Sequence, residues 1–397
     1  MKKTILSAAV IGGTAVLAAC STTGGEPVAA PSSGVPVASS PAASSAGASP
    51  GTTVPVPAGL DYGAYPTKAR TITASENRSW VAEGNRMGDE ALIQANEVDP
   101  RLILGGAGLR SYPVLVGDGL RSRVPDATAR AFQANTMRVG MTTTRGDALD
   151  KPTVAVRIGL YRFETPDAAK QAVDAIRTAT AAAPKVRITV DGAPDVLASE
   201  FKPGTVDAYV VQGPFVVNVS GTGPTTAQGA QFVTKAYSLE LPKLKGFAPT
   251  AVDQIRKLDV DKDGILSRAL PASGSQDPTL QENWYTWNGQ LHRIPDITKT
   301  ETYRAAGIDL FGNTGSGSIV HRTRDAAAAT TMVQTIAGKN PAVAGIPQLP
   351  TVKCMTGGDL TYCWIPVGRY VASVYDSNAA VARQKAAAQF SILATTP

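Results

Sequence analysis

The sequence predicts an α+β protein with two related domains, each an antiparallel sheet with helices packed on one face. Three observations predict this fold class. Short segments of alternating apolar and polar residues, typical of strands, occur between segments with the apolar spacing of helices. The order strand, helix, strand, strand, helix occurs twice along the chain. Matching strings in the two halves also lie at a nearly constant separation, which indicates an internal duplication.

The duplication rests on short strings at corresponding places. The string TPDAA that begins at Thr165 corresponds to TRDAA at Thr323, 158 residues later, and AQF recurs at the same separation. GPFV at Gly213 resembles GRYV at Gly368, 155 residues later, so alignment of the two halves requires a short insertion or deletion. Two alanine-rich helices can resemble each other by chance, and the shared order of elements is what favours duplication.

The TPDAA and TRDAA strings both predict the start of a helix. Thr165 is a suitable N-cap with Pro166 in the first turn, and Thr323 or Asp325 can cap the second helix. A strand precedes each helix and a hairpin follows it. The predicted strand segments are residues 153–163, 207–221, 305–322 and 361–376.

Composition divides the chain into four parts. Residues 1–19 are predicted to form a signal peptide, and residues 20–59 a lipidated cysteine with a low-complexity tether. Residues 60–245 are predicted to form the first domain, with an extra N-terminal helical region. Residues 246–397 are predicted to form the second domain, which begins with a connector at 246–272. The two domains together are long enough for two substantial cores.

The first twenty residues resemble the signal of a bacterial lipoprotein. A basic start is followed by an apolar run from Thr4 to Leu17, which is shorter than the roughly 20 residues of a transmembrane helix. The small residues before Cys20 resemble a lipobox, in which the cysteine is diacylated and becomes the first mature residue. The sequence therefore predicts a lipid-anchored protein on the extracytoplasmic face of the cell membrane. An ordinary secretion signal with an incidental cysteine is the alternative.

The tether and the net charge limit the classes of partner that we expect. Residues 21–59 carry a single charge, Glu26, and as a flexible coil would span roughly 35 Å. The formal net charge of +6 is not gathered into a dense Lys/Arg stripe, so we expect no nucleic-acid partner. The expected partners are the membrane, through acyl chains on Cys20, and an unknown envelope partner or small ligand.

Cys354 and Cys363 predict one disulfide, since no other cysteine follows Cys20 in the sequence. If a hairpin turn centres on Gly358 and Asp359, the two cysteines face each other as a non-hydrogen-bonded pair. Such pairs lie about 4.5 Å apart at Cα, which a disulfide tolerates. A redox-active CxxC motif would have a much shorter spacing.

The string LDVDKDGILSRAL at residues 258–270 resembles the first half of an EF-hand calcium loop. Its candidate ligands are Asp259, Asp261, Asp263, the carbonyl of Ile265, and Ser267. Leu270 stands where the loop needs a bidentate glutamate, so about five ligands are offered where calcium takes six to eight. One hypothesis is a weakly calcium-binding interaction protein, and the other is an Asp-rich connector between the domains.

No complete catalytic motif occurs in the sequence. G-x-S-x-G, H-E-x-x-H and P-loop strings are missing, and His292 and His321 are expected at the surface or at strand ends. We therefore expect no enzyme and no cofactor other than the hypothetical calcium. A carboxylate-dependent hydrolase of cell-wall polymers is the alternative, with the candidate carboxylates Glu97, Asp99, Asp296 and Glu301.

Trp284, Tyr285 and Trp287 are candidates for a ligand-binding groove. Trp284 and Trp287 lie three residues apart, whereas Tyr285 and Trp287 share a face if the segment is a strand. Packing in the core is the competing interpretation, because aromatic side chains contribute most to cores.

Several strings together resemble a family of uncharacterised two-domain lipoproteins of the actinobacterial cell envelope. They are the lipobox, the tether, LDYGAYPTKART, EGNRMGDEALIQANEVDPRL and DKDGILSRAL. The resemblance spans residues 60–397 and implies no established activity or catalytic residues. The sequence thus predicts a non-enzymatic binding or structural module of the cell envelope. A deep pocket between the domains would favour a small ligand, and a large exposed apolar patch would favour a protein partner.

Overall fold

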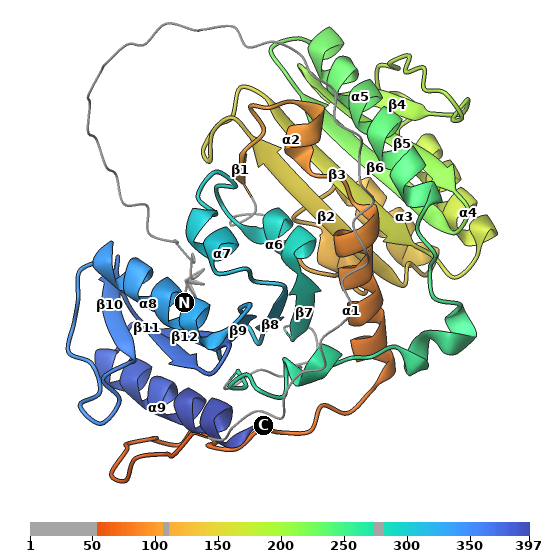
Figure 1. Ribbon diagram of the computed structural model, residues 1–397. Coiled ribbons are helices and arrows are strands. Elements are labelled where there is room, and N and C mark those ends of the chain that lie inside the picture. Colours follow the sequence, from red (N-terminus) through yellow and green to blue (C-terminus); the bar gives the residue numbers. More distant parts are fainter. Residues whose placement is uncertain (1–53, 106–110, 273–281) are drawn as a thin grey trace, which may run out of the picture.

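The computed structural model describes residues 54–105, 111–272 and 282–397 (Figure 1). The predicted signal peptide, Cys20 and the tether as far as residue 53 lie outside these residues. The predicted α+β class is confirmed, because the described residues form two six-stranded antiparallel sheets with helices around them.

The two sheets have the same topology. The first has the order β1-β2-β3-β6-β5-β4, and the second, taken from its β7 edge, has β7-β8-β9-β12-β11-β10. The strands of the first sheet are β1 (Leu104–Gly105), β2 (Val139–Gly146), β3 (Ala155–Arg162), β4 (Leu197–Lys202), β5 (Thr205–Gln212) and β6 (Phe215–Thr222). Those of the second are β7 (Asn283–Thr286), β8 (Leu310–Asn313), β9 (Ile319–Arg322), β10 (Lys353–Gly357), β11 (Leu360–Val367) and β12 (Tyr370–Asp376). This identical connectivity supports the predicted duplication.

Helices occur at corresponding places in the two halves. The α-helices are α1 (Glu76–Arg86), α2 (Ala95–Val98), α3 (Asp126–Ala134), α4 (Pro166–Ala179), α5 (Thr226–Lys245), α6 (Trp287–Arg293), α7 (Glu301–Ala305), α8 (Ala326–Gly338) and α9 (Ala379–Thr395). A π-helix, η1 (Met87–Ala91), follows α1, and the 3-10 helices are η2 (Gly117–Leu120), η3 (Val252–Lys257) and η4 (Lys262–Gly264). The pairs α4 and α8, and α5 and α9, occupy equivalent positions in the two repeats.

Each repeat contains more strands than the sequence predicts. In both sheets three strands precede the first equivalent helix and three strands follow it. The strands that the sequence pattern does not show in the first domain include β2 and β4. Thr and Gly dominate β2, and polar residues dominate the second half of β4, so neither has the apolar alternation that predicts a strand.

The helices cover both faces of each sheet, which corrects the prediction of one covered face. Ile158 and Leu160 of β3 belong to the core under α5, whereas Tyr161 of the same strand belongs to the core under α3 and α4. In the second domain α8 and α9 lie on opposite sides of β11 and β12, as Figure 1 shows. Strands with apolar side chains on both faces need a cover on both faces.

The predicted helix starts are confirmed. The Thr165 hydroxyl accepts a hydrogen bond of 3.2 Å from the Ala168 N–H, with Pro166 in the first turn of α4. The Asp325 carboxylate accepts one of 2.7 Å from the Ala328 N–H at the start of α8. Each cap satisfies a backbone N–H that the helix itself leaves without a partner.

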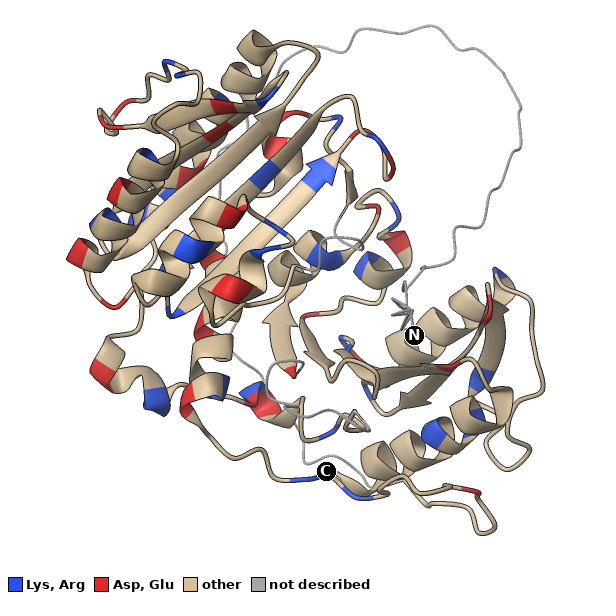
Figure 2. Cartoon of the chain, turned by 180° about the vertical axis from the view of Figure 1, so that it is seen from behind, with Lys and Arg blue, Asp and Glu red and all other residues tan. Residues whose placement is uncertain are grey.

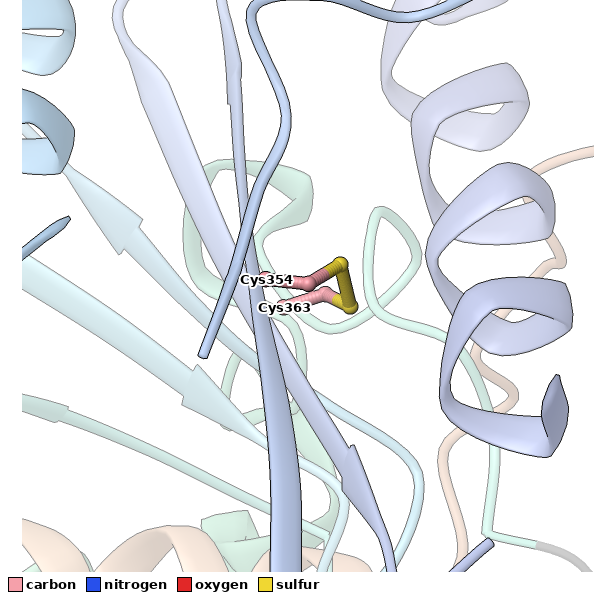
Figure 3. Close-up of a disulfide and its surroundings, with 2 residues drawn as sticks. All are labelled: Cys354 and Cys363. Carbon is pink, nitrogen blue, oxygen red and sulfur yellow. A yellow bond between two sulfur atoms is a disulfide. The ribbon is translucent and has the colours of Figure 1, made fainter. Parts of the chain in front are cut away.

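The predicted disulfide between Cys354 and Cys363 is present. The two residues are paired directly across β10 and β11, with Cα atoms 4.1 Å apart. Gly357 pairs with Leu360, so the hairpin has the predicted register. The bridge projects from the sheet toward α9 and is buried in the core beneath that helix (Figure 3).

The N-terminal arm, residues 54–72, packs on the second domain although it precedes the first domain in sequence. The Val54 N–H donates a 3.0 Å hydrogen bond to the Ala394 carbonyl in α9, and Leu60 is buried in the core beside α9. This differs from the expected tether limit of residue 59 and the expected start of the first domain at residue 60. The arm is rich in Pro and Gly and forms no helix or strand. Its apolar residues therefore have no regular spacing from which their burial could be predicted.

The connector at 246–272 is shared between the domains. Phe247 and Ile255 belong to the core of the first domain, whereas Ile265 and Leu270 belong to that of the second. The change of domain therefore falls near the Asp-rich string, as the connector hypothesis predicts.

Candidate functional site

The helix α1 and the π-helix η1 lie where the two domains meet. α1 contacts β2 of the first sheet, β7 of the second and η3 of the connector (Figure 1). Trp80 and Met87 enter the core of the first domain, and Ala82 enters that of the second. Since π-helices are rare and occur frequently at functional sites, this segment is a candidate position for a site.

Glu83 of α1 is a buried carboxylate with a structural role. It accepts hydrogen bonds of 3.0 Å from Arg86, of 3.0 Å from the Thr250 N–H and of 2.9 Å from the Thr250 hydroxyl. Arg162 of β3 also donates to it and lies 5.1 Å from the centre of the Trp80 ring. Glu83 therefore joins α1, β3 and the connector, and its oxygens are occupied by these bonds.

Asp89 of η1 reaches across to the second domain. Its Oδ1 accepts a 2.6 Å hydrogen bond from the Gly289 N–H, and its Oδ2 accepts one of 3.0 Å from the Thr286 N–H. Asp89 thus caps α6 from outside that helix. Burial raises the pKa of Asp89, and the hydrogen bonds and the nearby Arg293 counteract the increase.

His292 and Arg145 fill the same junction. His292 is 0% exposed and His321 3%, which corrects the expectation of surface histidines. Arg145 donates hydrogen bonds of 3.1 and 2.9 Å to the carbonyls of Ile103 and Ile294. Burial, with the nearby Arg and Lys side chains, holds the pKa of His292 well below its usual value, so His292 is neutral at pH 7.

The junction between the two domains is tightly packed. A cavity of about 10 Å³ lies between α1 and the second domain, lined among others by Arg78, Glu282 and Trp284. This volume has room for about one water molecule. Glu282 is held there by Arg78 and Arg70, each at 2.6 Å. This cavity is too small for a small-molecule ligand.

An open pocket of about 220 Å³ lies on the first-domain side of the same helix. It is lined by Glu76, Trp80, Arg138, Val252, Asp253, Ile255 and Arg256. Helix α1, the residue before β2, and η3 of the connector each contribute to it. Ligand pockets for drug-sized molecules measure roughly 300–1,000 Å³, so this pocket suits one ring or one side chain.

The pocket combines a buried aromatic residue with charged residues. Trp80 and Ile255 are each 4% exposed, whereas the side chains of Glu76 and Arg256 are 47% and 71% exposed. The charged groups therefore form the rim. Arg256 donates a 2.7 Å hydrogen bond to Glu76, and this bond is the main cause that lowers the pKa of Glu76. The Trp80 indole N–H also lies near Glu76, but its geometry falls short of a hydrogen bond.

Sequence reasoning missed this pocket. Trp80 has the helical spacing of a core residue, and Val252 and Ile255 have that of a helix entering the Asp-rich string. The sequence pattern does not predict that Arg138 lies beside these residues, because that contact depends on how α1 lies across the first sheet. One sequence signal could have indicated the pocket. It is the occurrence of apolar residues at helical spacing within the charged strings ENRSW and VDQIRK.

The three predicted groove aromatics are packed in cores. Trp284 belongs to the core beside α9, and its indole N–H donates to the Asp259 carbonyl at 3.2 Å. Tyr285 is 1% exposed and stacks on Phe311 with ring centres 5.4 Å apart. Trp287 packs against the same cluster and is partly buried. The structure thus favours the core interpretation over a groove built by these residues.

The structure does not gather the Asp-rich string into a metal site. Across residues 54–105, 111–272 and 282–397, no group of three or more His, Cys, Asp or Glu side chains is placed to hold a metal ion. Asp261 accepts hydrogen bonds from the Leu266 N–H (2.6 Å) and the Ser267 N–H (3.1 Å).

The neighbouring candidate ligands are engaged elsewhere. Asp259 accepts a 2.9 Å hydrogen bond from the Asp261 N–H, and Asp263 pairs with Arg322 at 2.7 Å. Ile265 is buried in the second core, and the Ser267 hydroxyl donates to the Gly264 carbonyl at 2.8 Å. The carboxylates therefore shape the turn of the connector.

Three of the four carboxylates considered for hydrolysis accept local hydrogen bonds. Glu97 accepts one of 2.7 Å from the Gln94 N–H, in the capping box of α2. Asp99 binds Arg101, and Asp296 accepts bonds from Thr298. Glu301 lies in the first turn of α7. These contacts give the carboxylates structural roles in their own segments.

The exposed surface carries mixed charge and few large apolar side chains. Lys/Arg and Asp/Glu lie interspersed over the first domain in Figure 2, without a stripe of one sign. Within the described ranges, the exposed large hydrophobic residues are Val54, Val116, Leu149 and Phe201. In the same residues no helix is both long and apolar enough to cross a membrane.

Comparisons with known proteins place the chain in a family. No curated protein matches the sequence. A solved structure, the extracellular domain of PknH from Mycobacterium tuberculosis, is 16% identical and covers 42% of this chain and 93% of its own, with a TM-score of 0.25. That score is too low to inform fold or function. Two family models match, the N-terminal domain of unknown function DUF7373 over residues 71–260 and its C-terminal counterpart over residues 265–396. The chain therefore belongs to the two-domain DUF7373 family, whose function is unknown.

Proposed function

We propose that the protein is a lipid-anchored binding module of the cell envelope that holds its partner noncovalently in the pocket beside Trp80. The open pocket of about 220 Å³ is the observation that carries this proposal. Its buried aromatic residue offers an apolar contact, and its charged rim offers hydrogen bonds and ion pairs. This combination is typical of binding sites.

The chemistry of the pocket indicates the kind of group that it takes. A single ring or apolar side chain fits the volume beside Trp80 and Ile255. Arg138 and Arg256 on the rim favour an anionic substituent, and Glu76 and Asp253 favour a neighbouring donor. We expect one anchoring residue or ring of a larger envelope partner, or a small molecule of that size.

A binding role without catalysis is supported by how the buried ionisable groups are used. Glu83 and Asp89 are occupied by hydrogen bonds that join segments of the fold. His292 and His321 are inside the protein, away from solvent. The binding proposal thus assigns a structural role to each of these groups.

Native mass spectrometry of the protein purified from producing cells tests binding. We expect a bound mass that the Arg256→Ala variant loses and that the Arg130→Ala variant keeps. Arg130 is a matched control, since its side chain is 62% exposed on α3 and does not line the pocket. Equal adducts in both variants would place the ligand elsewhere and refute the pocket.

The lipid anchor is tested separately. Cys20→Ala removes the thiol that would be acylated, and we expect the variant to leave the membrane fraction, because two acyl chains supply stable anchoring. Unchanged membrane partitioning of Cys20→Ala would contradict the anchor without bearing on the pocket.

A further inference from the structure

The last helix of the chain is covered on two opposite sides. One side of α9 packs on β11 and β12, and the arm, residues 54–72, covers the other. The arm meets α9 at Gln384, Ser391 and Ala394. These positions are seven and three residues apart in the sequence, so they lie on one face of the helix.

The contacts combine polar and apolar groups. Asp61 accepts a 2.9 Å hydrogen bond from Gln384, and the Ser391 hydroxyl lies 3.4 Å from that of Tyr62. Leu60 is 9% exposed within the core of the second domain. Further arm residues that pack against this core are Val56, Tyr62, Tyr65 and Ile72.

Without the arm, α9 would lose the cover on the face that carries Gln384 and Ser391. Every residue of α9 from Lys385 to Ala394 is buried, and a helix buried all round needs cover on every side. The family region of the second domain, residues 265–396, does not include the arm. Residues 54–70 also precede the family region of the first domain, which begins at residue 71. The core of the second domain thus includes side chains from a segment upstream of both family regions.

We propose that the arm is a strap that fastens the membrane tether to the second domain through the outer face of α9. The partner of this face is the chain's own segment 54–72, which continues directly from the tether. Tension on the anchor then acts first on α9 and the core of the second domain. The strap rests on the lipid anchor of the proposed function, but its contact with α9 can be measured independently.

Proteolytic cleavage between the strap and the rest of the chain, residues 74–397, tests the contact between the strap and α9. A protease site is inserted between Thr73 and Ala74, which are both exposed, in the full lipidated chain. The protein is folded on vesicles of phosphatidylethanolamine and phosphatidylglycerol and then cut. We expect the body, residues 74–397, to stay on the vesicles through the noncovalent strap.

Two matched variants define the outcome. Leu60→Asp places a charge in the buried contact, and we expect the cut body to leave the vesicles at least about tenfold faster. Ala64→Asp adds the same charge at an exposed arm position and should release at the rate of the parent chain. Equally rapid release of all three bodies would overturn the strap. If Leu60→Asp does not fold, free peptide 54–72 is added to the cut parent protein on the vesicles as a competitor. Release of the body only when the peptide is present supports the strap, and release without the peptide contradicts it.

Failure of the anchor gives a different result. An uncut chain that does not float with the vesicles shows that the lipid anchor is wrong. In that case the cut soluble protein is analysed by gel filtration, where co-elution of the arm fragment with the body supports the strap and separation contradicts it.

Discussion

The Oδ1 atom of Asp89 lies 2.6 Å from the backbone nitrogen of Gly289, so a carboxylate in the first family region caps a helix in the second. Asp89 lies in the string EGNRMGDEALIQANEVDPRL, which carries part of the family resemblance. The string thus encodes the junction between the repeats. Its buried charges are satisfied by partners in both domains, so the two domains form one unit in which loss of a single partner is costly.

Asp89→Ala is expected to destabilise the protein by about 1–3 kcal/mol. The change leaves the buried N–H groups of Thr286 and Gly289 without acceptors, and unsatisfied buried donors cost about this much. Urea unfolding measures the loss. Glu90→Ala is the control, because Glu90 is 49% exposed and forms a surface pair with Arg86. Equal losses in the two variants would contradict the capping role.

Glu240 predicts a pH dependence of stability. This fully buried side chain accepts a 2.9 Å hydrogen bond from the Ile93 N–H, and burial raises its pKa from 4.5 to about 8. The folded state therefore holds a proton that the unfolded state releases between these values, so stability falls as pH rises from about 4.5 to 8.

Glu240→Gln keeps the acceptor and removes this titration. Relative to the variant, the parent chain should lose stability on the order of 4 kcal/mol between pH 5 and pH 8. Urea unfolding at pH 5, 6.5 and 8 gives the comparison. Parallel pH profiles of the two proteins would show that Glu240 is not the buried acid described.

Reduction of the disulfide should weaken the second domain. Mass mapping without reductant should find Cys354 joined to Cys363, and reduction should cost roughly 2–3 kcal/mol for so short a loop. The double variant Cys354→Ser/Cys363→Ser should be insensitive to reductant. Free thiols in the native protein would refute the disulfide.

Asp261→Ala tests whether the Asp-rich string acts as a turn or as a calcium ligand. Since Asp261 accepts hydrogen bonds from the Leu266 and Ser267 N–H groups, we expect the variant to melt at a lower temperature in calcium and in chelator alike. Thermal denaturation in both buffers measures this. A stabilisation by calcium that only the parent chain shows would restore the calcium hypothesis.

The sequence predicts most accurately what depends on neighbouring residues. The Thr165 and Asp325 caps and the Cys354–Cys363 pair follow from spacing within one helix or hairpin, and each is confirmed. The duplication is visible because the equivalent helices α4 and α8 begin with similar strings, TPDAA and TRDAA. β2 is missed since its Thr-rich sequence lacks alternation, although the sheet buries it.

Long-range placement cannot be predicted from these patterns. The burial of His292 depends on η1 lying against α6, more than two hundred residues apart in sequence. Leu60 enters the second core because the arm, which precedes the first domain in sequence, lies along α9 of the second domain. The pocket requires Arg138 and Arg256 to meet beside Trp80, a contact set by tertiary packing and not by spacing.

The binding proposal is tested most directly by fluorine NMR of protein labelled with 5-fluorotryptophan. The chain has four tryptophans, and of these only Trp80 lines the open pocket. Replacement of Trp80 by Phe assigns its resonance, and a low-molecular-mass extract of the producing cells' envelope supplies the ligand. We expect the Trp80 resonance to shift while those of Trp287 and Trp364 stay unchanged. A shift confined to Trp287 or Trp364, or no shift, would contradict the binding proposal.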